Sequence, residues 1–247
     1  HLSIRRQRQM CIRDRVIPCQ EGEYFNDLII KEYIAYKLFE QVSPYFFRTR
    51  LINLTLTDKQ SKKGKTYTLT AFVLEDVDNV AENYGAKTKD SGLVLPQLVN
   101  DTLALRQDFF AFMIGNTDWS NTTQHNVKML DTGQGKLIPV AYDFDYSGLV
   151  NAPYAIPYDY LPIKKVTERL YRGICRNEGL TQLVKADFLQ RENTILKTLE
   201  NYRLSLPNSE YDLARNYLID FFSILKNEEE FNSQISKACQ NYNLIEN

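Results

Sequence analysis

The stretch that most constrains the fold is Phe110 to Gly148, because it places carboxylates, amides and a histidine along an apolar framework. Within it, two runs of β-forming residues, 126–130 and 137–142, flank a segment rich in turn-forming residues. These runs predict an antiparallel hairpin in which Asn126 lies opposite Asp143. Polar side chains from both strands are therefore expected at one end of the hairpin.

A second acidic residue precedes the hairpin. Asp118 follows a helix predicted for residues 101–113, so its carboxylate is expected to converge on the same end of the hairpin. Asp145 lies two residues beyond Asp143 and therefore on the same face of an extended strand. Magnesium prefers oxygen ligands of this kind, usually one or two carboxylates together with phosphates and water. The stretch thus predicts a catalytic or nucleotide-binding centre.

The chain contains, in this order, a predicted helix, the residues GNTD, Asn126, a predicted hairpin and the residues YDFD. This order resembles the core of protein-kinase-like folds, most nearly the CotH-type and HipA-type atypical kinases. The resemblance implies an α+β fold that is a truncated form of the two-lobed kinase architecture. Its amino-terminal lobe would be small and contain β-strands, and its carboxy-terminal lobe would be mostly helical. The resemblance extends over about residues 26–148 and is specific between Gly115 and Gly148.

The resemblance also implies roles for individual residues in a reaction that uses ATP with Mg²⁺ or Mn²⁺. Asp118 would be the catalytic-loop acid that orients the acceptor hydroxyl. Asn126 and Asp143 would be metal ligands, with Asp145 as a reserve ligand. The pattern departs from ordinary protein kinases in two ways, because Asp118 and Asn126 are eight positions apart and YDFD replaces DFG.

Two further residues of the loop have competing interpretations. His125 either orients Asp118 or touches phosphate, or it orders the loop through a backbone hydrogen bond. Asn116 is expected to hold the loop through a side-chain bond to its own backbone. Phe109, Phe110 and neighbouring apolar residues of the preceding helix are expected to form the core beneath Asp118.

The amino-terminal part of the resemblance predicts a nucleotide site. Residues 26–41 show helical spacing, with Asn26 as the expected N-cap. In the kinase-like interpretation, Glu32 of this helix pairs with a strand lysine; the alternative is a solvated glutamate beside Lys31.

Strands are predicted at 47–57 and 65–75, joined by a polar turn. A hinge follows at Leu74 to Val77, where kinase-like folds hold the adenine. Glu75 and Val77 are thus candidate nucleotide-binding residues.

Beyond Gly148 the sequence predicts a loop and then helices. Residues 149–165 carry prolines and tyrosines, typical either of a substrate-facing loop or of a packed connector. Helical spacing is found at 166–176, 179–203, 209–226 and 228–241. Arg169 and Arg172 are expected on a solvated helix face, with an acidic loop or a phosphate as the alternative partner. Ser209 with Asp212 is similar to a capping box.

Composition limits the class of protein. The chain has 247 residues, 43% of them hydrophobic, which suffices for a large core. A net charge of −1 without a long basic block argues against nucleic acid as a partner. The sequence has no run of 18 apolar residues, so it predicts no membrane span. The four cysteines are scattered without a CxxC pair, which argues against a zinc site or a dense disulfide framework.

The first fifteen residues differ from the rest, since they hold five arginines against nine in the other 232. The run MCIRDR resembles the translation of a sequencing-library adapter, so residues 1–15 are expected to be a non-native arm; the alternative is a natural arginine-rich arm. The predicted organisation is then a partial amino-terminal lobe at 16–77 and a carboxy-terminal lobe at 78–247. The phosphate-binding loop and strand lysine of a kinase-like fold would lie upstream of this chain.

Three functions compete. The leading one is an atypical kinase-like phosphotransferase that binds a nucleotide and acts on an unknown protein, sugar or small-molecule acceptor. The second is a pseudokinase-type module that binds nucleotide or metal without turnover. The third is a metal-dependent hydrolase or glycosyltransferase, because a DxD pair also occurs in such sites. Similar bacterial chains, of the type found in Bacteroidetes, suggest a periplasmic or envelope location.

Overall fold

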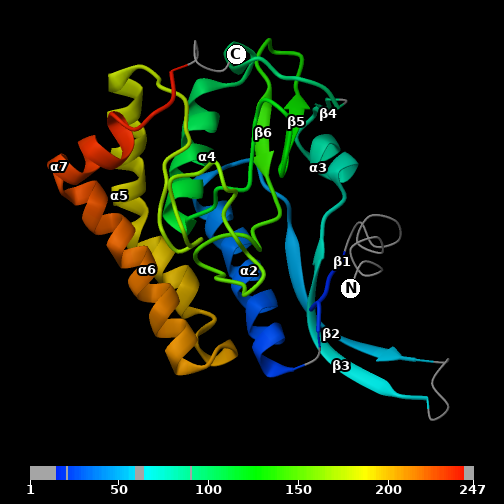
Figure 1. The fold of residues 1–247 in the computed structure, drawn as a ribbon. Helices are drawn as coiled ribbons and strands as arrows, with labels where there is room; N and C mark the ends of the chain where they lie inside the picture. Colours follow the sequence, from blue (N-terminus) through cyan, green and yellow to red (C-terminus); the bar gives the residue numbers. More distant parts are fainter. Residues whose placement is uncertain (1–14, 21, 59–63, 90, 242–247) are drawn as a thin grey trace.

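The protein is a mixed α+β structure with two small antiparallel sheets. The computed structural model describes residues 15–20, 22–58, 64–89 and 91–241. The expectations for residues 1–14 and for the tip of the 58–64 turn therefore lie outside the described residues. In Figure 1 the hairpin of β2 and β3 projects from one side of the molecule, and helices α5 and α6 lie on the other side.

The first sheet has the strand order β1-β3-β2. Its strands are β1 (Arg15–Val16), β2 (Thr49–Thr57) and β3 (Thr66–Leu74), so the predicted hairpin is confirmed. Helix α2 (Glu23–Val42) packs on this sheet through the rings of Tyr33 and Tyr36 against Phe72. Aromatic contacts of this kind hold the helix on the sheet.

Helix α2 begins three residues before the expected N-cap, so that expectation is wrong. Gly22 takes the N-cap position, where it makes no side-chain cap. Asn26 lies inside the helix, and its Oδ1 accepts a hydrogen bond from the Thr70 backbone N–H at 3.1 Å. Asn26 therefore ties the helix to β3 instead of starting the helix.

The second sheet has the order β4-β5-β6, with β4 (Lys87–Thr88), β5 (Val127–Asp131) and β6 (Ile138–Ala141). Helix α3 (Val77–Asn83) directly follows β3, and the side chain of Asp76 caps it. The predicted β5–β6 hairpin is confirmed, but its register is shifted by one residue because Val127 pairs with Ala141. Asn126 therefore faces Tyr142 and not Asp143.

Helix α4 (Asp101–Ile114) forms the centre of the core. Asn100 caps its amino end by accepting from the Leu103 N–H at 3.1 Å. Phe109, Phe110 and their neighbours are buried, which confirms their predicted place in the core. The helix ends at Gly115 with φ 66, and a Cβ there would lie 2.1 Å from the Tyr217 hydroxyl. Only glycine fits this close approach, so the sequence ends the helix at a defined residue.

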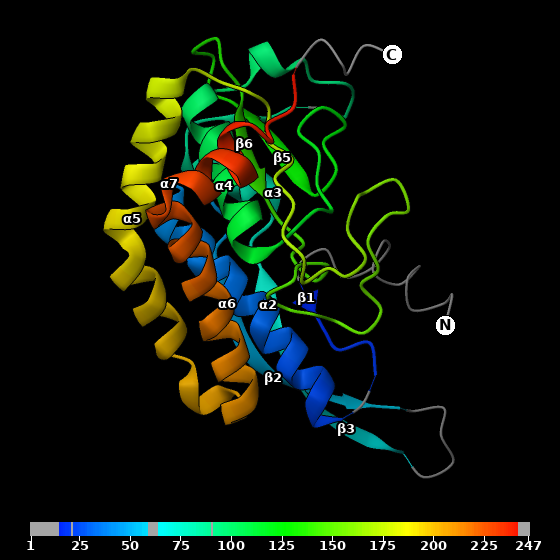
Figure 2. The same ribbon diagram turned by 60° about the vertical axis from the view of Figure 1, so that its left-hand side comes forward.

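The carboxy-terminal part is helical, as predicted, but its first helix begins at Glu178 and not at residue 166. Helices α5 (Glu178–Glu200) and α6 (Asn208–Lys226) pack side by side, followed by α7 (Glu228–Phe231) and a π-helical turn, Asn232–Ser236. Figure 2 shows α5, α6 and α2 as neighbouring, roughly aligned helices. Short 3₁₀ turns occupy Pro96–Leu98 and Arg203–Ser205.

Two expectations for this region are wrong. Residues 166–176 form no helix. The capping box at Ser209 is also wrong, because α6 starts after Pro207 without a side-chain cap. None of the described helices is both long and apolar enough to cross a membrane.

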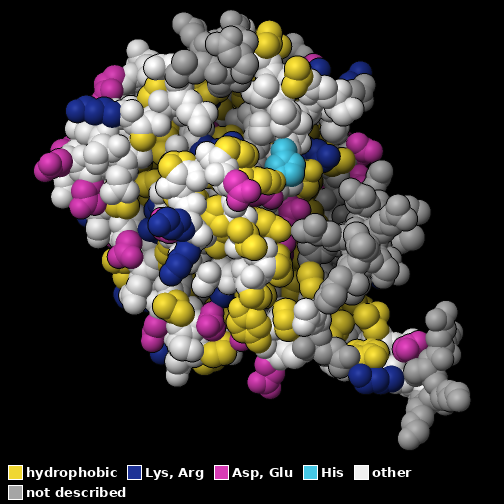
Figure 3. Space-filling model, viewed as in Figure 1, with side chains coloured by type: hydrophobic (Ala, Val, Ile, Leu, Met, Phe, Trp, Pro, Cys, Tyr) yellow, Lys and Arg dark blue, Asp and Glu magenta, His cyan; other side chains and the backbone are white. Residues whose placement is uncertain are grey.

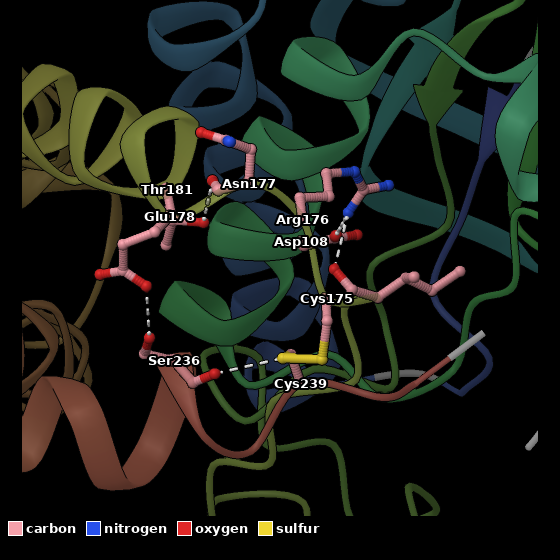
Figure 4. Close-up of a disulfide and its surroundings, with 9 residues drawn as sticks. Asp108, Cys175, Arg176, Asn177, Glu178, Thr181, Ser236 and Cys239 are labelled. Atoms are coloured by element: carbon pink, nitrogen blue, oxygen red, sulfur yellow. Dashed lines mark hydrogen bonds and ion pairs between the residues drawn. A yellow bond between two sulfur atoms is a disulfide. The ribbon is translucent and has the colours of Figure 1, made fainter. Parts of the chain in front are cut away.

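A disulfide joins Cys175, just before α5, to Cys239, just after the π-helical turn (Figure 4). The next residue, Arg176, donates to the buried carboxylate of Asp108 at 2.6 Å. Burial raises the pKa of Asp108 to about 6, while the neighbouring Arg176 lowers it. The disulfide therefore links the carboxy-terminal segment to Cys175, whose neighbour Arg176 forms an ion pair with Asp108 of α4.

Replacing both cysteines, Cys175→Ser with Cys239→Ser, is expected to lower the free energy of unfolding by about 2–4 kcal/mol, because the bond closes a long loop in the unfolded chain. Chemical denaturation without reductant measures this loss. Ser236→Ala, which alters a half-buried neighbour of Cys239, is the matched control and is expected to change stability by less than about 0.5 kcal/mol. Equal stability of the double variant and the wild type would show that the bond does not form.

Candidate functional site

The loop after α4 holds Asp118 in place through its neighbours. Asn116 Oδ1 accepts from the Asp118 backbone N–H at 2.9 Å, which confirms the predicted side-chain turn. The Asp118 side chain is only 14% exposed. Asn126 Nδ2 donates to the Asp118 backbone oxygen at 2.8 Å and to Oδ2 at 3.1 Å. These bonds orient the carboxylate before any ligand arrives.

His125 has both of the interactions that its competing interpretations require. Its Nε2 lies 2.8 Å from Asp118 Oδ1, while its backbone pairs with that of Ser120 in both directions. The side chain is half exposed, so solvent reaches the ring. Figure 3 shows a histidine on this face of the molecule with acidic side chains beside it. His125 therefore both shapes the loop and orients the carboxylate.

Asn126 and Asp143 share an unusual backbone conformation. Their φ angles are 51° and 61°, in the left-handed region that residues other than glycine rarely adopt. Two hydrogen bonds hold this geometry: Tyr142 N–H donates to Asn126 O at 3.0 Å, and Asp143 N–H donates to the Tyr36 hydroxyl at 2.8 Å. Such strain is typical of sites where a side chain must point in one direction.

Tyr36 connects this strained turn to helix α2. Its hydroxyl is fully buried, and burial together with the nearby Glu32 and Asp143 carboxylates raises its pKa well above the ordinary value. The phenol therefore stays neutral at physiological pH and accepts the Asp143 N–H bond as a hydroxyl. Loss of this hydroxyl would remove the acceptor of the Asp143 N–H bond.

Asp145 does not share a strand face with Asp143, because β6 ends at Ala141 and the alternation of a strand no longer applies. Asp145 is 6% exposed, and its Oδ2 accepts from the Tyr154 hydroxyl at 3.1 Å. It is not part of the wall of the cavity that Asp143 lines. Its neighbours therefore differ from those of Asp143.

A cavity of about 420 Å³ opens between the two sheets. Glu32 from α2 and Asp143 from the end of β6 line it together with the segment 74–78, which includes Glu75 and Val77. Three stretches that the sequence assigned to one nucleotide site thus meet in one cavity. Its volume is in the range of small-molecule sites.

The charges of the cavity wall are mostly negative. The acidic residues are Glu32, Glu75, Asp76, Asp78 and Asp143. The basic residues are Arg15 from β1 and Lys128 from β5, whose ammonium also lies 5.3 Å from the centre of the Tyr142 ring. A negative wall suits a cation, or an anion that arrives with a divalent cation.

The donor set fits a small hard metal such as Mg²⁺. Because Asn126 Nδ2 is used in bonds to Asp118, its carbonyl oxygen remains the atom that can act as a ligand. Asp143 carries a carboxylate and follows Tyr142, whose backbone N–H donates to the Asn126 carbonyl oxygen. In the described part of the chain, no group of three His, Cys, Asp or Glu side chains is arranged to hold a metal. One carboxylate and one amide, with phosphates and water, match the magnesium pattern.

Two arginines hold this loop, a contact that the sequence offered only as the alternative to a solvated helix face. Arg169 donates to the Phe112 and Met113 carbonyls at 3.2 and 3.3 Å, at the carboxyl end of α4. Arg172 donates to the Thr117 carbonyl and, at 3.2 Å, to that of Trp119. Their expected place on a solvated helix face is wrong, because the side chains bind carbonyls on both sides of Asp118.

The sequence analysis also missed two tyrosines. Tyr154 contacts Asp145, and the Tyr158 hydroxyl donates to Asp118 Oδ1 at 2.9 Å. Both belong to the segment 149–165, which contains no regular secondary structure. The tyrosines that alternate with prolines in this segment indicated a substrate-facing loop or a packed connector. This pattern does not specify which carboxylate each tyrosine contacts.

No protein-family model matches this chain, and no curated protein matches it significantly.

Arg172→Ala is expected to lower the free energy of unfolding by about 1–3 kcal/mol, because the loop carbonyls lose charged donors. Hydrogen exchange should become faster at the amides of Asp118 and Ser120, which belong to the loop. Arg48→Ala is the matched control, since its side chain is 68% exposed and its pair with Glu75 at 3.8 Å is worth at most about 1 kcal/mol. Unchanged exchange at both loop amides in Arg172→Ala would contradict a positioning role.

Proposed function

We propose that the protein is an atypical kinase-like phosphotransferase that uses ATP and a divalent cation such as Mg²⁺. The observation that carries this proposal is the cavity in which Glu32, the segment 74–78 and Asp143 meet. The hydrogen-bonded pair of Asp118 and Asn126 lies beside it along the β5–β6 hairpin. A fold of two lobes, divided near residue 77, belongs to the same proposal.

Each residue has a task that its surroundings support. Asp118, held by His125 and Asn126, orients the acceptor hydroxyl and receives its proton. Asn126 and Asp143 hold the cation, which when bound neutralises negative charge on the phosphates. The segment 74–78 and the ring of Tyr142 provide the walls against which a base packs.

The loop geometry supports this assignment of tasks. Transfer of a phosphoryl group requires positioning and electrostatic stabilisation more than covalent chemistry by the protein. The Asp118 loop is held by Asn116 and Arg172, and Asp143 is held by Tyr36. Rigid placement before binding is what such a mechanism requires.

A second candidate is a binding module that holds the metal–nucleotide complex without turnover. The contact of Tyr158 with Asp118 favours it, because this carboxylate already has a hydroxyl partner from the same chain. Both candidates share the cavity and differ only in whether a phosphoryl group is transferred. Turnover assays with ATP distinguish them.

Calorimetry with ATP and Mg²⁺ tests the binding site that both candidates share. The wild type should bind ATP with Mg²⁺, and Asp143→Ala should lose at least about tenfold in affinity because a metal ligand is removed. Asp212→Ala removes an exposed aspartate of α6 and is the matched control, expected to bind as the wild type does. A folded wild type that binds neither metal nor nucleotide would refute both candidates.

A further inference from the structure

The segment 169–176, which we call the arginine segment, holds the backbone on both sides of Asp118. Arg172 donates to the Thr117 carbonyl and, at 3.2 Å, to that of Trp119. A guanidinium group carries several donors in fixed directions, so one arginine fixes these two carbonyls relative to each other. The position of the arginine segment therefore limits where the Asp118 loop can lie.

The other end of the arginine segment packs closely against the middle of α4. Arg176 Nη1 donates to Asp108 Oδ2 at 2.6 Å, and these two side chains are 8% and 1% exposed. A Cβ added at Gly173 would lie 2.6 Å from the same oxygen, so only glycine allows this approach. The backbone between Arg172 and Arg176 therefore has little freedom while these contacts last.

One covalent bond fixes the arginine segment to the carboxy-terminal part of the described chain (Figure 4). Cys175 lies three residues after Arg172 and forms the disulfide with Cys239. Two hydrogen bonds run beside it: Cys175 N–H donates to the Gln240 carbonyl at 3.0 Å, and Gln240 N–H donates to the Gly173 carbonyl at 2.9 Å. Gln240 is exposed, so water competes for both bonds once the covalent link is broken.

The disulfide lies where a reductant can reach it. Both cysteines are half-buried, and Lys237, Ala238 and Gln240 around Cys239 are exposed. Reduction begins when a thiolate attacks one sulfur of the disulfide, so its rate depends on access to that sulfur. The bond is therefore open to attack in the folded protein.

We propose that the Cys175–Cys239 disulfide is a redox switch that sets the position of the Asp118 loop through the arginine segment. The inference goes beyond the proposed function and does not depend on it. In the reduction, a dithiol supplies two electrons and two protons. The S–S bond breaks, each sulfur gains a hydrogen, and the dithiol itself becomes a disulfide. The arginine segment is then held by non-covalent contacts alone, and the Asp118 loop opens more often.

Opening of the loop changes the candidate site directly. His125 Nε2 lies 2.8 Å from Asp118 Oδ1, and Asn126 Nδ2 donates to Oδ2 at 3.1 Å. Both bonds require the backbone of Asp118 to stay in place, because a carboxylate on a displaced backbone no longer meets these partners. The candidate site is thus ordered under oxidising conditions and relaxed under reducing ones.

Hydrogen exchange at the Asp118 and Ser120 amides, measured on the full chain before and after reduction with dithiothreitol, tests the proposal. We expect exchange at both amides to become at least about twofold faster after reduction, because coupled contacts shift a local equilibrium by that factor or more. Alkylation followed by intact mass shows that the disulfide has been reduced. Far-UV circular dichroism should stay unchanged, which shows that the fold persists.

Three variants separate the switch from a general loss of stability. In Arg172→Ala, reduction should change exchange at the two loop amides by less than about twofold, because the link to the loop has already been removed. Arg48→Ala removes an arginine whose side chain is 68% exposed, and it should respond to reduction as the wild type does. Cys175→Ser with Cys239→Ser should exchange like the reduced wild type and should not respond to dithiothreitol.

Three outcomes would overturn the proposal. Equal exchange at the two loop amides in the oxidised and the reduced wild type refutes it. The same acceleration in Arg172→Ala as in the wild type shows that reduction acts through unfolding of the whole chain, and this refutes the link. A disulfide that dithiothreitol reduces only in denaturant refutes a switch in the folded protein. Each of these outcomes leaves the proposed function standing, since calorimetry with ATP and Mg²⁺ tests that function separately.

Discussion

The burial of Phe144 is the interaction on which the acidic region depends. Its ring lies 4.7 Å from that of Tyr36 and 5.4 Å from that of Phe110, which joins helices α2 and α4. Because Phe144 stands between Asp143 and Asp145 in the chain, its place in the core limits where both carboxylates can lie. Burying a phenylalanine stabilises the structure by about 1.5–3 kcal/mol, which offsets a cost of about 1–3 kcal/mol for one strained residue at its edge. The core thus maintains the left-handed backbone at Asp143.

The loop on the other side of the region depends on hydrogen bonds instead of apolar packing. Helix α4 ends at Ile114 with Gly115 as its C-cap, and Arg169 and Arg172 donate to carbonyls of its last turn and of the following loop. Guanidinium groups suit this task because several donors point in fixed directions. Asp118 therefore lies on a loop whose carbonyls accept hydrogen bonds from guanidinium groups.

The Cys175–Cys239 disulfide makes the carboxy-terminal segment part of the same framework. It adjoins the buried pair of Arg176 and Asp108, and Asp108 belongs to α4, the helix that precedes the Asp118 loop. The local contacts of α4 thus extend from the Asp118 loop to the end of the described chain.

The sequence by itself determined the elements whose signals are local. Helical periodicity located α4, and alternation with turn residues located both hairpins. The clustering of Glu32, the segment 74–78 and Asp143 was predicted only through the resemblance of their order to a known fold. Tertiary structure decided the one-residue register shift of the β5–β6 hairpin. It also prevented a helix at 166–176, where Arg169 and Arg172 bind carbonyls far away in the chain, and it brought Tyr158 to Asp118 across 40 residues. Contacts between distant residues leave no periodic signal in the sequence, since each partner satisfies its own local pattern, and only packing shows which of them meet.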